Sequence, residues 1–228
     1  MKYDRTFSLV VLLFTTIFLS ACASSGKMAD ESAANDASSS DTKALEELYW
    51  AKMEAAKTKF VKADVDFMTG MIGHHAQALI MSAMAPQNDA GPEILILTSR
   101  ITNAQKDEIA TMQNWLRDRK QEVPEVHIDG TMLMVHGGGE HAMHMPGMLT
   151  QEQLDELDMA KGVDFDRLFL TYMIQHHQGA VSMVKELFSH DGAGQDELAF
   201  KVANDINVDQ LTEIARMELM LKALTNTN

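Results

Sequence analysis

The chain has 228 residues, enough for one globular unit with an apolar core, and its 33 acidic and 19 basic side chains give a formal net charge of −14. That charge repels phosphate backbones and argues against a nucleic-acid partner. Ala, Leu, Met, Glu, Gln and Lys dominate the body and alternating runs of Val and Ile are scarce, so the composition predicts an all-α fold.

The amino terminus has the pattern of a bacterial export signal. Lys2 and Arg5 precede an apolar run at residues 7–19, which is too short for a comfortable membrane span. The next residues, Leu-Ser-Ala-Cys, resemble a lipobox, in which the cysteine is diacylated and becomes the new amino terminus. Cys22 is the only cysteine in the chain, so it forms no internal disulfide. We therefore predict a signal peptide at residues 1–21, a lipid anchor on Cys22 and an envelope location facing the periplasm; ordinary signal cleavage is the alternative.

Residues 22–42 are rich in Ser, Ala and Asp without apolar periodicity, which predicts a flexible tether. A helical bundle domain is expected over residues 43–228. Its predicted helices span residues 43–61, 64–85, 92–119, 150–161, 164–190 and 196–224. The short helix has a capping-box start at Thr150, and Asp164 is expected to cap the helix that follows. Residues 120–149 contain two prolines and three consecutive glycines, and are expected to be irregular.

Two segments of the chain repeat one another. FMTGMIGHHAQALIM at residues 67–81 returns as FLTYMIQHHQGAVSM at residues 169–183, and the helices that follow also align, with Ile101, Gln105, Glu108, Ile109, Met112 and Leu116 matching Ile206, Gln210, Glu213, Ile214, Met217 and Leu221. The repeated unit is therefore a helical hairpin. Two such hairpins predict a four-helix bundle with pseudo-twofold symmetry, plus the short extra helix and a Gly/His/Met-rich connector.

The repeated block carries soft metal ligands in a chain that contains 18 methionines. Residues three, four and seven apart form one stripe on a helix. The two stripes are Met71, His74, His75 and Met81, and Met173, His176, His177 and Met183. Adjacent histidines diverge by about 100°, so one of each pair could ligate while its neighbour bonds elsewhere. The alternative is that these are core histidines satisfied by Glu108, Glu213 or backbone carbonyls.

The residues before the histidines argue against a di-iron bundle. Such bundles supply Glu-x-x-His, whereas Met71, Ile72, Met173 and Ile174 occupy the equivalent positions here. Thioether and imidazole suit copper(I), or silver(I), better than iron(II), manganese or magnesium. Zinc remains open through the histidines alone.

The connector HGGGEHAMHMPGM offers a second group of candidate ligands. These are His141, Met143, His144, Met145 and Met148, together with His136. Backbone freedom at the glycines would let several of them wrap one ion; a flexible loop without function is the alternative. His127 and His190 follow no pattern and are interpreted as surface residues.

These blocks, with the connector MPGMLTQEQLDEL and the following FDRLFLTYMIQHHQGAVSM, resemble the domain-of-unknown-function 305 family over about residues 60 to 224. That family is a ferritin-like helical group that includes CopM-like periplasmic copper-binding proteins. The resemblance implies a helical bundle and a copper ion near the two stripes listed above.

The predicted function is an envelope copper(I)-binding protein, with silver(I) as a second cargo, acting in copper buffering, transfer or resistance, with the copper ion and copper-transfer proteins as partners. A non-catalytic helical lipoprotein that binds an apolar partner is the alternative, since a Met-lined groove accepts such partners. A metal-dependent oxidoreductase, a hydrolase or a haem bundle finds less support. No G-x-S-x-G, metallohydrolase signature, nucleotide-binding glycine loop or C-x-x-C-H is present, so we expect no enzyme.

Overall fold

A computed structural model describes residues 31–137 and 145–226. The chain forms two units, Met1–Glu47 and Leu48–Asn228, and the first helix, α1 (Glu31–Ala56), runs through the boundary between them. Cys22 and the predicted signal peptide lie outside the described residues.

Helix α1 begins at Glu31 rather than at residue 43, so residues 31–42 are helical where a flexible tether was expected. No Gly or Pro occurs between Gly26 and Gly70, and several residues of this segment are alanine. Without a helix-breaking residue, a helix that starts in the Leu- and Glu-rich part propagates towards the amino terminus.

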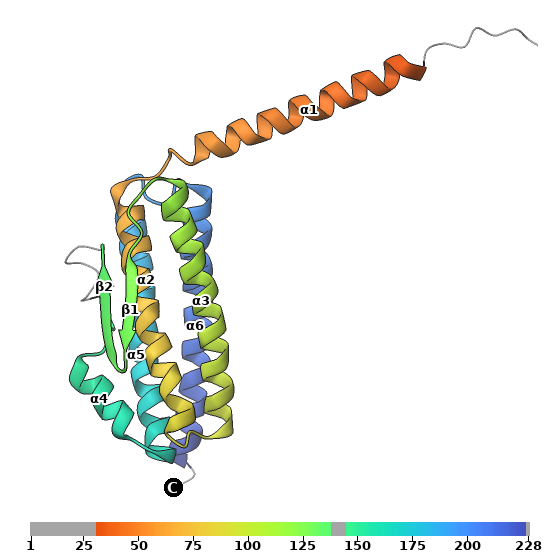
Figure 1. Ribbon diagram of the computed structural model, residues 1–228. Coiled ribbons are helices and arrows are strands. Elements are labelled where there is room, and N and C mark those ends of the chain that lie inside the picture. The colour runs from red at the N-terminus through yellow and green to blue at the C-terminus, as the bar shows by residue number, and fades with distance from the viewer. Residues whose placement is uncertain (1–30, 138–144, 227–228) are drawn as a thin grey trace, which may run out of the picture. The chain divides into compact units, whose positions relative to one another are not determined.

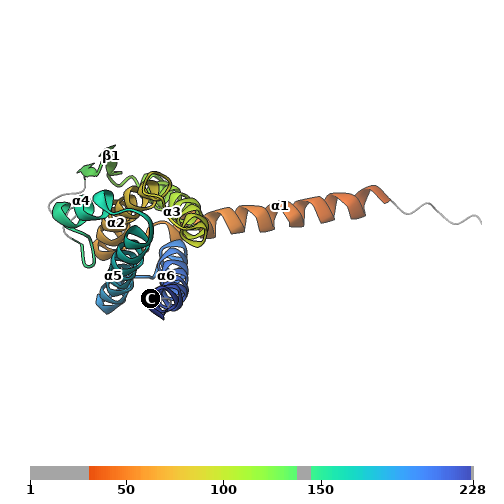
Figure 2. The ribbon, with the colours of Figure 1, turned by 90° about the horizontal axis from the view of Figure 1, so that it is seen from below.

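The second unit is built on four long helices: α2 (Lys62–Met84), α3 (Pro92–Asp118), α5 (Gly162–Ser189) and α6 (Glu197–Asn226). Around the bundle the order of neighbours is α2, α3, α6 and α5, which Figure 2 shows from one end. Neighbouring helices run antiparallel (Figure 1). The two His-His helices, α2 and α5, are therefore adjacent. A long crossover joins α3 to α5, as in ferritin-like bundles. The prediction of an all-α bundle of two helical hairpins is confirmed, apart from one small sheet.

The crossover contains the short helix α4 (Gln151–Met159), and a 3₁₀ turn, η1 (Ala85–Gln87), ends α2 at Pro86. The predicted capping box of α4 is present, because Thr150 Oγ1 accepts from Gln153 N at 3.3 Å while Gln153 Oε1 accepts from Thr150 N at 3.0 Å. Helix α5 starts earlier than predicted, with Lys161 rather than Asp164 at its N-cap.

The crossover also contains a β-hairpin, β1 (Glu125–Asp129) and β2 (Met132–His136), where an irregular segment was expected. Asp129 pairs with Met132, leaving Gly130 and Thr131 as a two-residue turn in which Gly130 has φ 58°. A glycine at the first position of such a turn adopts positive φ without strain. The hairpin lies beside α2 (Figure 1).

Two aspartates in equivalent positions of the repeat lock the helical hairpins together. Asp64, in the first turn of α2, accepts from Gly194 N at 2.8 Å, so it holds the loop between α5 and α6. Asp166, near the start of α5, accepts from Gly91 N at 3.1 and 3.2 Å, so it holds the loop between η1 and α3. Each hairpin thus satisfies a loop amide of the other, which fixes their relative register.

The core consists of two apolar clusters. Phe67, Met71, Trp115 and Ile206 belong to one; Met81, Ile101, Phe165 and Met217 belong to the other. Within the ranges that the structure describes, no helix combines the length and apolar character needed to cross a bilayer.

A buried ion pair joins the end of α3 to the start of α6. Asp196 accepts from Arg119 Nε at 2.9 Å, from Trp115 Nε1 at 3.0 Å and from Ala199 N at 2.9 Å, and Arg119 NH2 makes a further contact with it. Burial alone would raise the pKa of Asp196, but these hydrogen bonds and the guanidinium lower it below its usual value.

Asp196→Ala should therefore lower the free energy of unfolding by roughly 3–5 kcal/mol, because it leaves the Arg119 guanidinium buried without its counter-charge. Urea unfolding of the two proteins measures the difference. Asp205→Ala is the matched control, since Asp205 pairs with Lys201 at the surface and such pairs contribute about 0–1 kcal/mol. Equal effects of the two substitutions would contradict the assignment.

Candidate metal centre

A polar layer separates the two apolar clusters. The four histidines of the repeated blocks are fully buried in it. Its members are His74 and His75 from α2, His176 and His177 from α5, Gln105 and Glu108 from α3, and Gln210 and Glu213 from α6. Gln105 and Gln210 are also buried and were not assigned a role from the sequence. Their equivalent positions in the repeat could have indicated that they belong to this layer.

His74 and His176 face each other across the interface of α2 and α5. Their ring centroids lie 3.8 Å apart with an interplanar angle of 39°. His74 Nε2 lies 3.0 Å from the carbonyl oxygen of Pro146, and His176 Nε2 lies 3.0 Å from that of His74. Because a carbonyl only accepts, we assign the proton to Nε2 in both rings. Each Nδ1 then keeps a lone pair, and each is buried with no hydrogen-bond partner among the described residues.

The second histidine of each block is held by a carboxylate from the neighbouring helix. His177 Nε2 lies 2.7 Å from Glu213 Oε2 in hydrogen-bond geometry. His75 Nε2 lies 2.7 Å from Glu108 Oε2, at angles that are poorer for a hydrogen bond. These two carboxylates are the hydrogen-bond partners expected from the sequence in the alternative in which the histidines bind no metal. The Nδ1 atoms of His75 and His177 are nevertheless buried and unpartnered within the described ranges.

Burial keeps the central imidazoles neutral. Desolvation, followed by repulsion from His75, lowers the pKa of His74 to about 3. Desolvation and the proximity of His74 also place the pKa of His176 well below its usual value. At the α3–α6 edge of the layer, burial and then repulsion by the carboxyl groups of Glu108 and Glu213 raise the pKa of Asp209. Neutral nitrogen donors therefore lie beside carboxylates, an arrangement that would accept a cation.

Two helical glycines let the connector reach this layer. A Cβ atom at Gly179 would lie 1.8 Å from the carbonyl oxygen of Pro146, so only glycine allows the connector to lie against α5 there. A Cβ at Gly70 would lie 2.7 Å from Met145 Cε and 3.4 Å from Met183 Cε. The side chains of Met145 and Met183 therefore meet over Gly70 of α2. Neither glycine was singled out from the sequence, because only a tertiary approach gives them a role.

The repeat is asymmetric where the connector lies. Gln77 occupies the position equivalent to Gly179, and its side chain donates to the Leu149 carbonyl at 3.0 Å and accepts from Leu149 N at 2.7 Å. The first repeat thus hydrogen-bonds the connector through Gln77, whereas the second has a glycine, Gly179, against which the connector packs. Together they fix the Pro146 carbonyl beside His74.

The predicted methionine ligands lie on both sides of the histidine layer. Met71 and Met183 belong to one apolar cluster, with Met145 packed against it, and Met81 and Met173 belong to the other. Met148 lines a hollow of about 390 Å³ with Met145 and Gln77. His141, Met143 and His144 lie outside the described residues. Among those that are described, no three His, Cys, Asp or Glu side chains are grouped closely enough to hold a metal ion, so an ion here would need a donor of another kind, such as a thioether or a backbone carbonyl.

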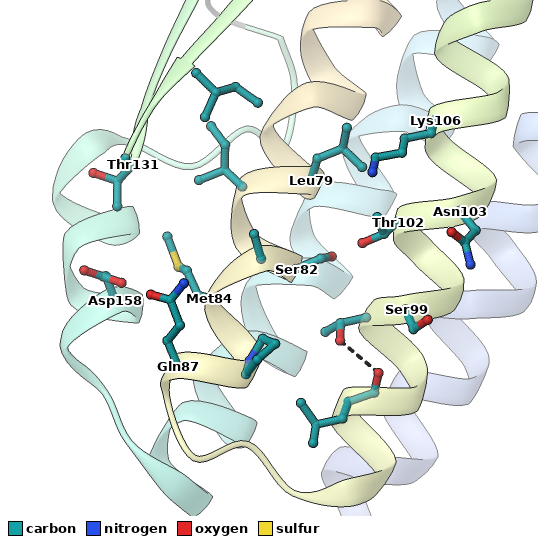
Figure 3. A pocket seen from close by; sticks show the side chains of 17 residues that line it. Leu79, Ser82, Met84, Gln87, Ser99, Thr102, Asn103, Lys106, Thr131 and Asp158 are labelled. Atoms are coloured by element: carbon teal, nitrogen blue, oxygen red, sulfur yellow. Dashed lines mark hydrogen bonds between the residues drawn. The ribbon is translucent and has the colours of Figure 1, made fainter.

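A groove of about 680 Å³ lies elsewhere, between α2, α3 and the crossover. Figure 3 shows Ser82 of α2 and Thr102 of α3 on one side of it and Thr131 and Asp158 on the other. Of the described residues that line it, none is a histidine and Met84 is the one methionine. The candidate ligands are therefore not gathered there.

The depressed pKa values predict a stability that falls in acid. The unfolded chain takes up a proton on His74 near pH 6.5, whereas the folded protein does so only near pH 3, and His176 shifts in the same direction. Stability present above pH 6.5 is therefore lost as the pH falls towards 3, at up to about 1.4 kcal/mol per pH unit for each group. Urea unfolding of metal-free protein between pH 7 and pH 4 measures the slope.

The matched variants isolate the histidines from the carboxylates, which titrate over the same range. His74→Gln should give a shallower slope, and His190→Ala, which removes a half-exposed imidazole, should keep that of the parent protein. A slope unchanged by His74→Gln would contradict the prediction.

Gly179→Ala should destabilise the fold, although Gly→Ala inside a helix ordinarily stabilises by about 0.5–1 kcal/mol. The reason is the contact with the Pro146 carbonyl, which must move and so loses its hydrogen bond from His74. We expect a loss of roughly 1–3 kcal/mol in urea unfolding. A gain in stability would show that the connector does not lie against α5.

The model of the domain of unknown function 305 (DUF305) family matches residues 64–221. A solved DUF305 fragment from Deinococcus radiodurans is 28% identical, with a TM-score of 0.59, over 72% of this chain and 98% of that one. A DUF305 protein from Streptomyces coelicolor, designated a secreted protein, is 26% identical, with a TM-score of 0.58, over 72% of this chain and 94% of that one.

CopM in its Cu(I)-bound form is 30% identical, with a TM-score of 0.52, over 70% of this chain and 96% of that one. CopM has also been solved in Cu(II)-bound, Ag-bound and apo forms. Among curated protein sequences, none matches this chain. Because the family model runs from the first turn of α2 to the last turns of α6, across all four bundle helices, the chain belongs to the DUF305 family.

Proposed function

We propose that this protein binds copper(I), and silver(I) as a chemical mimic, in the histidine layer of its bundle. The observation that carries the proposal is the set of four buried Nδ1 atoms without a hydrogen-bond partner in the described part of the chain. A buried polar atom of this kind costs about 1–3 kcal/mol unless something binds it. Ligating histidines commonly direct the other ring nitrogen to a carbonyl or carboxylate, as all four do here.

The preference for a soft monovalent ion follows from the donor that would join two imidazoles around it. Since no three His, Cys, Asp or Glu side chains of the described residues are grouped closely enough to hold an ion, an ion bound by two imidazoles would take a further donor from methionine. Met71 and Met183 lie on one side of His74 and His176, and Met145 meets Met183 over Gly70. Thioethers select copper(I) over iron(II), manganese or magnesium. CopM has been solved with Cu(I), with Cu(II) and with Ag, which supports copper or silver as the metal.

The protein would act by holding and releasing the ion rather than by catalysis. We infer a role in copper buffering, transfer or resistance on the envelope side of the cell, with copper-transfer proteins as partners and a lipid on Cys22 as the anchor. The secreted designation of the Streptomyces coelicolor relative supports an extracytoplasmic location. A ligand set buried in a fully folded bundle favours retention of the ion over turnover of a substrate.

Titration of the full chain with copper(I) against a chromophoric chelator, under anaerobic reducing conditions, tests the proposal. His74→Gln/His176→Gln should lower copper(I) affinity at least about 100-fold, because glutamine keeps a donor for the carbonyls and replaces imidazole nitrogen with a hard oxygen. Met183→Leu, which conserves volume, should weaken binding by about 10-fold or more while leaving the fold intact.

Met217→Leu is the matched control for methionine, since Met217 is fully buried on α6 in the apolar cluster on the other side of the histidine layer from Met183. Copper(I) should also raise the melting temperature of the parent protein more than that of the double variant, by linkage of binding to folding. Unchanged chelator competition in a double variant that remains folded by circular dichroism would rule out the histidine layer as the site.

A further inference from the structure

The two faces of the β-hairpin carry different kinds of side chain. Alternate residues of a strand point to opposite faces, and cross-strand partners share a face. The register therefore places Val126, Ile128, Leu133 and Val135 on one face and Glu125, His127, Asp129, Met132, Met134 and His136 on the other. Val126 and Leu133 pack against the two core clusters, so the second face points away from the bundle. Every residue on that outer face is a potential metal ligand.

Three of these ligands lie close together. His127 is directly opposite Met134, which places their Cβ atoms about 4.5–5.5 Å apart. His136 is the diagonal neighbour of His127, at about 7–8 Å between the residues, within the span of two imidazoles that share one ion. Both histidines are exposed and line one hollow of about 720 Å³, whereas Met134 is partly buried.

Charges of both signs lie around the hollow. Glu125 lies directly opposite His136, and Glu122 Oε1 lies 2.8 Å from where a Cβ of Gly137 would be. Arg117 of α3 also lines the hollow, and its guanidinium is hydrogen-bonded to Asn114. The two carboxylates offset the positive charge of Arg117.

We propose that His127, Met134 and His136 form a second, surface copper(I) site on the outer face of the hairpin. Two imidazoles and one thioether are a donor set of the same softness as the buried one, in a position that costs no desolvation of the protein interior. An ion bound there exchanges with solvent and with a partner protein, whereas an ion in the histidine layer is enclosed. The site does not require copper in the buried layer, so each can be tested alone.

The experiment is a copper(I) titration of the full chain against the chromophoric chelator, with the number of bound equivalents as the readout. His127→Ala/His136→Ala should lose one equivalent and keep the tighter binding of the histidine layer. Met134→Leu should lower the affinity for that copper(I) ion by about 10-fold or more. The number of copper(I) ions bound at saturation should stay unchanged. His190→Ala, which removes an imidazole from α5, should lose nothing.

A direct readout comes from the imidazole resonances of His127 and His136 in nuclear magnetic resonance spectra, assigned with the two single variants. Silver(I) should shift both together, and Met134→Leu should raise the silver(I) concentration needed.

Each outcome separates the two proposals. If the hairpin double variant keeps every equivalent while His74→Gln/His176→Gln loses one, the hairpin site is wrong and the buried site stands. If only the hairpin variant loses copper, the hairpin site stands and the buried site is wrong. Loss of all equivalents in the hairpin variant would overturn its independence from the layer. Loss in neither would overturn both.

Discussion

The structure depends on one costly arrangement, a layer of buried imidazoles between two apolar clusters. Four Nε2 atoms face oxygen acceptors, and four Nδ1 atoms face none in the described parts of the chain. Hydrophobic packing in the two apolar clusters stabilises the fold and offsets the free-energy cost of the unpartnered nitrogens. Leucine or alanine at these positions would pack without that penalty, so apolar packing alone does not account for the four histidines.

The duplication of the helical hairpin explains how the histidine layer is assembled. The departures from symmetry explain why the two halves of the candidate metal site differ. The aspartates Asp64 and Asp166 hold the two hairpins in equivalent ways, which brings the two histidine blocks into register. The connector then breaks the equivalence, since it bonds to Gln77 on one side and lies against Gly179 on the other. A strictly symmetric dimer of hairpins would have no place for Met145 or for the Pro146 carbonyl.

The sequence predicted what local periodicity encodes. The helices, the capping box at Thr150 and the adjacent imidazoles that diverge in direction all follow from the spacing of residues along a helix. It did not predict features that need a tertiary neighbour, such as the glycine contacts at Gly70 and Gly179. The hairpin was missed for a different reason: Asp129-Gly130 between apolar alternations is a recognisable turn signal, but prolines and glycines nearby favoured an irregular loop.

The hairpin and the layer differ in the one property that decides how an ion moves, namely solvent access. In the proposed function, the fully buried layer would bind tightly and exchange slowly, because the connector beside it is held by two hydrogen bonds with Gln77. The exposed imidazole and thioether groups of the hairpin would exchange an ion quickly but hold it less firmly, because water competes for every position. The crossover between α3 and α5 would then supply the exposed site through its hairpin and cover the buried one through the connector.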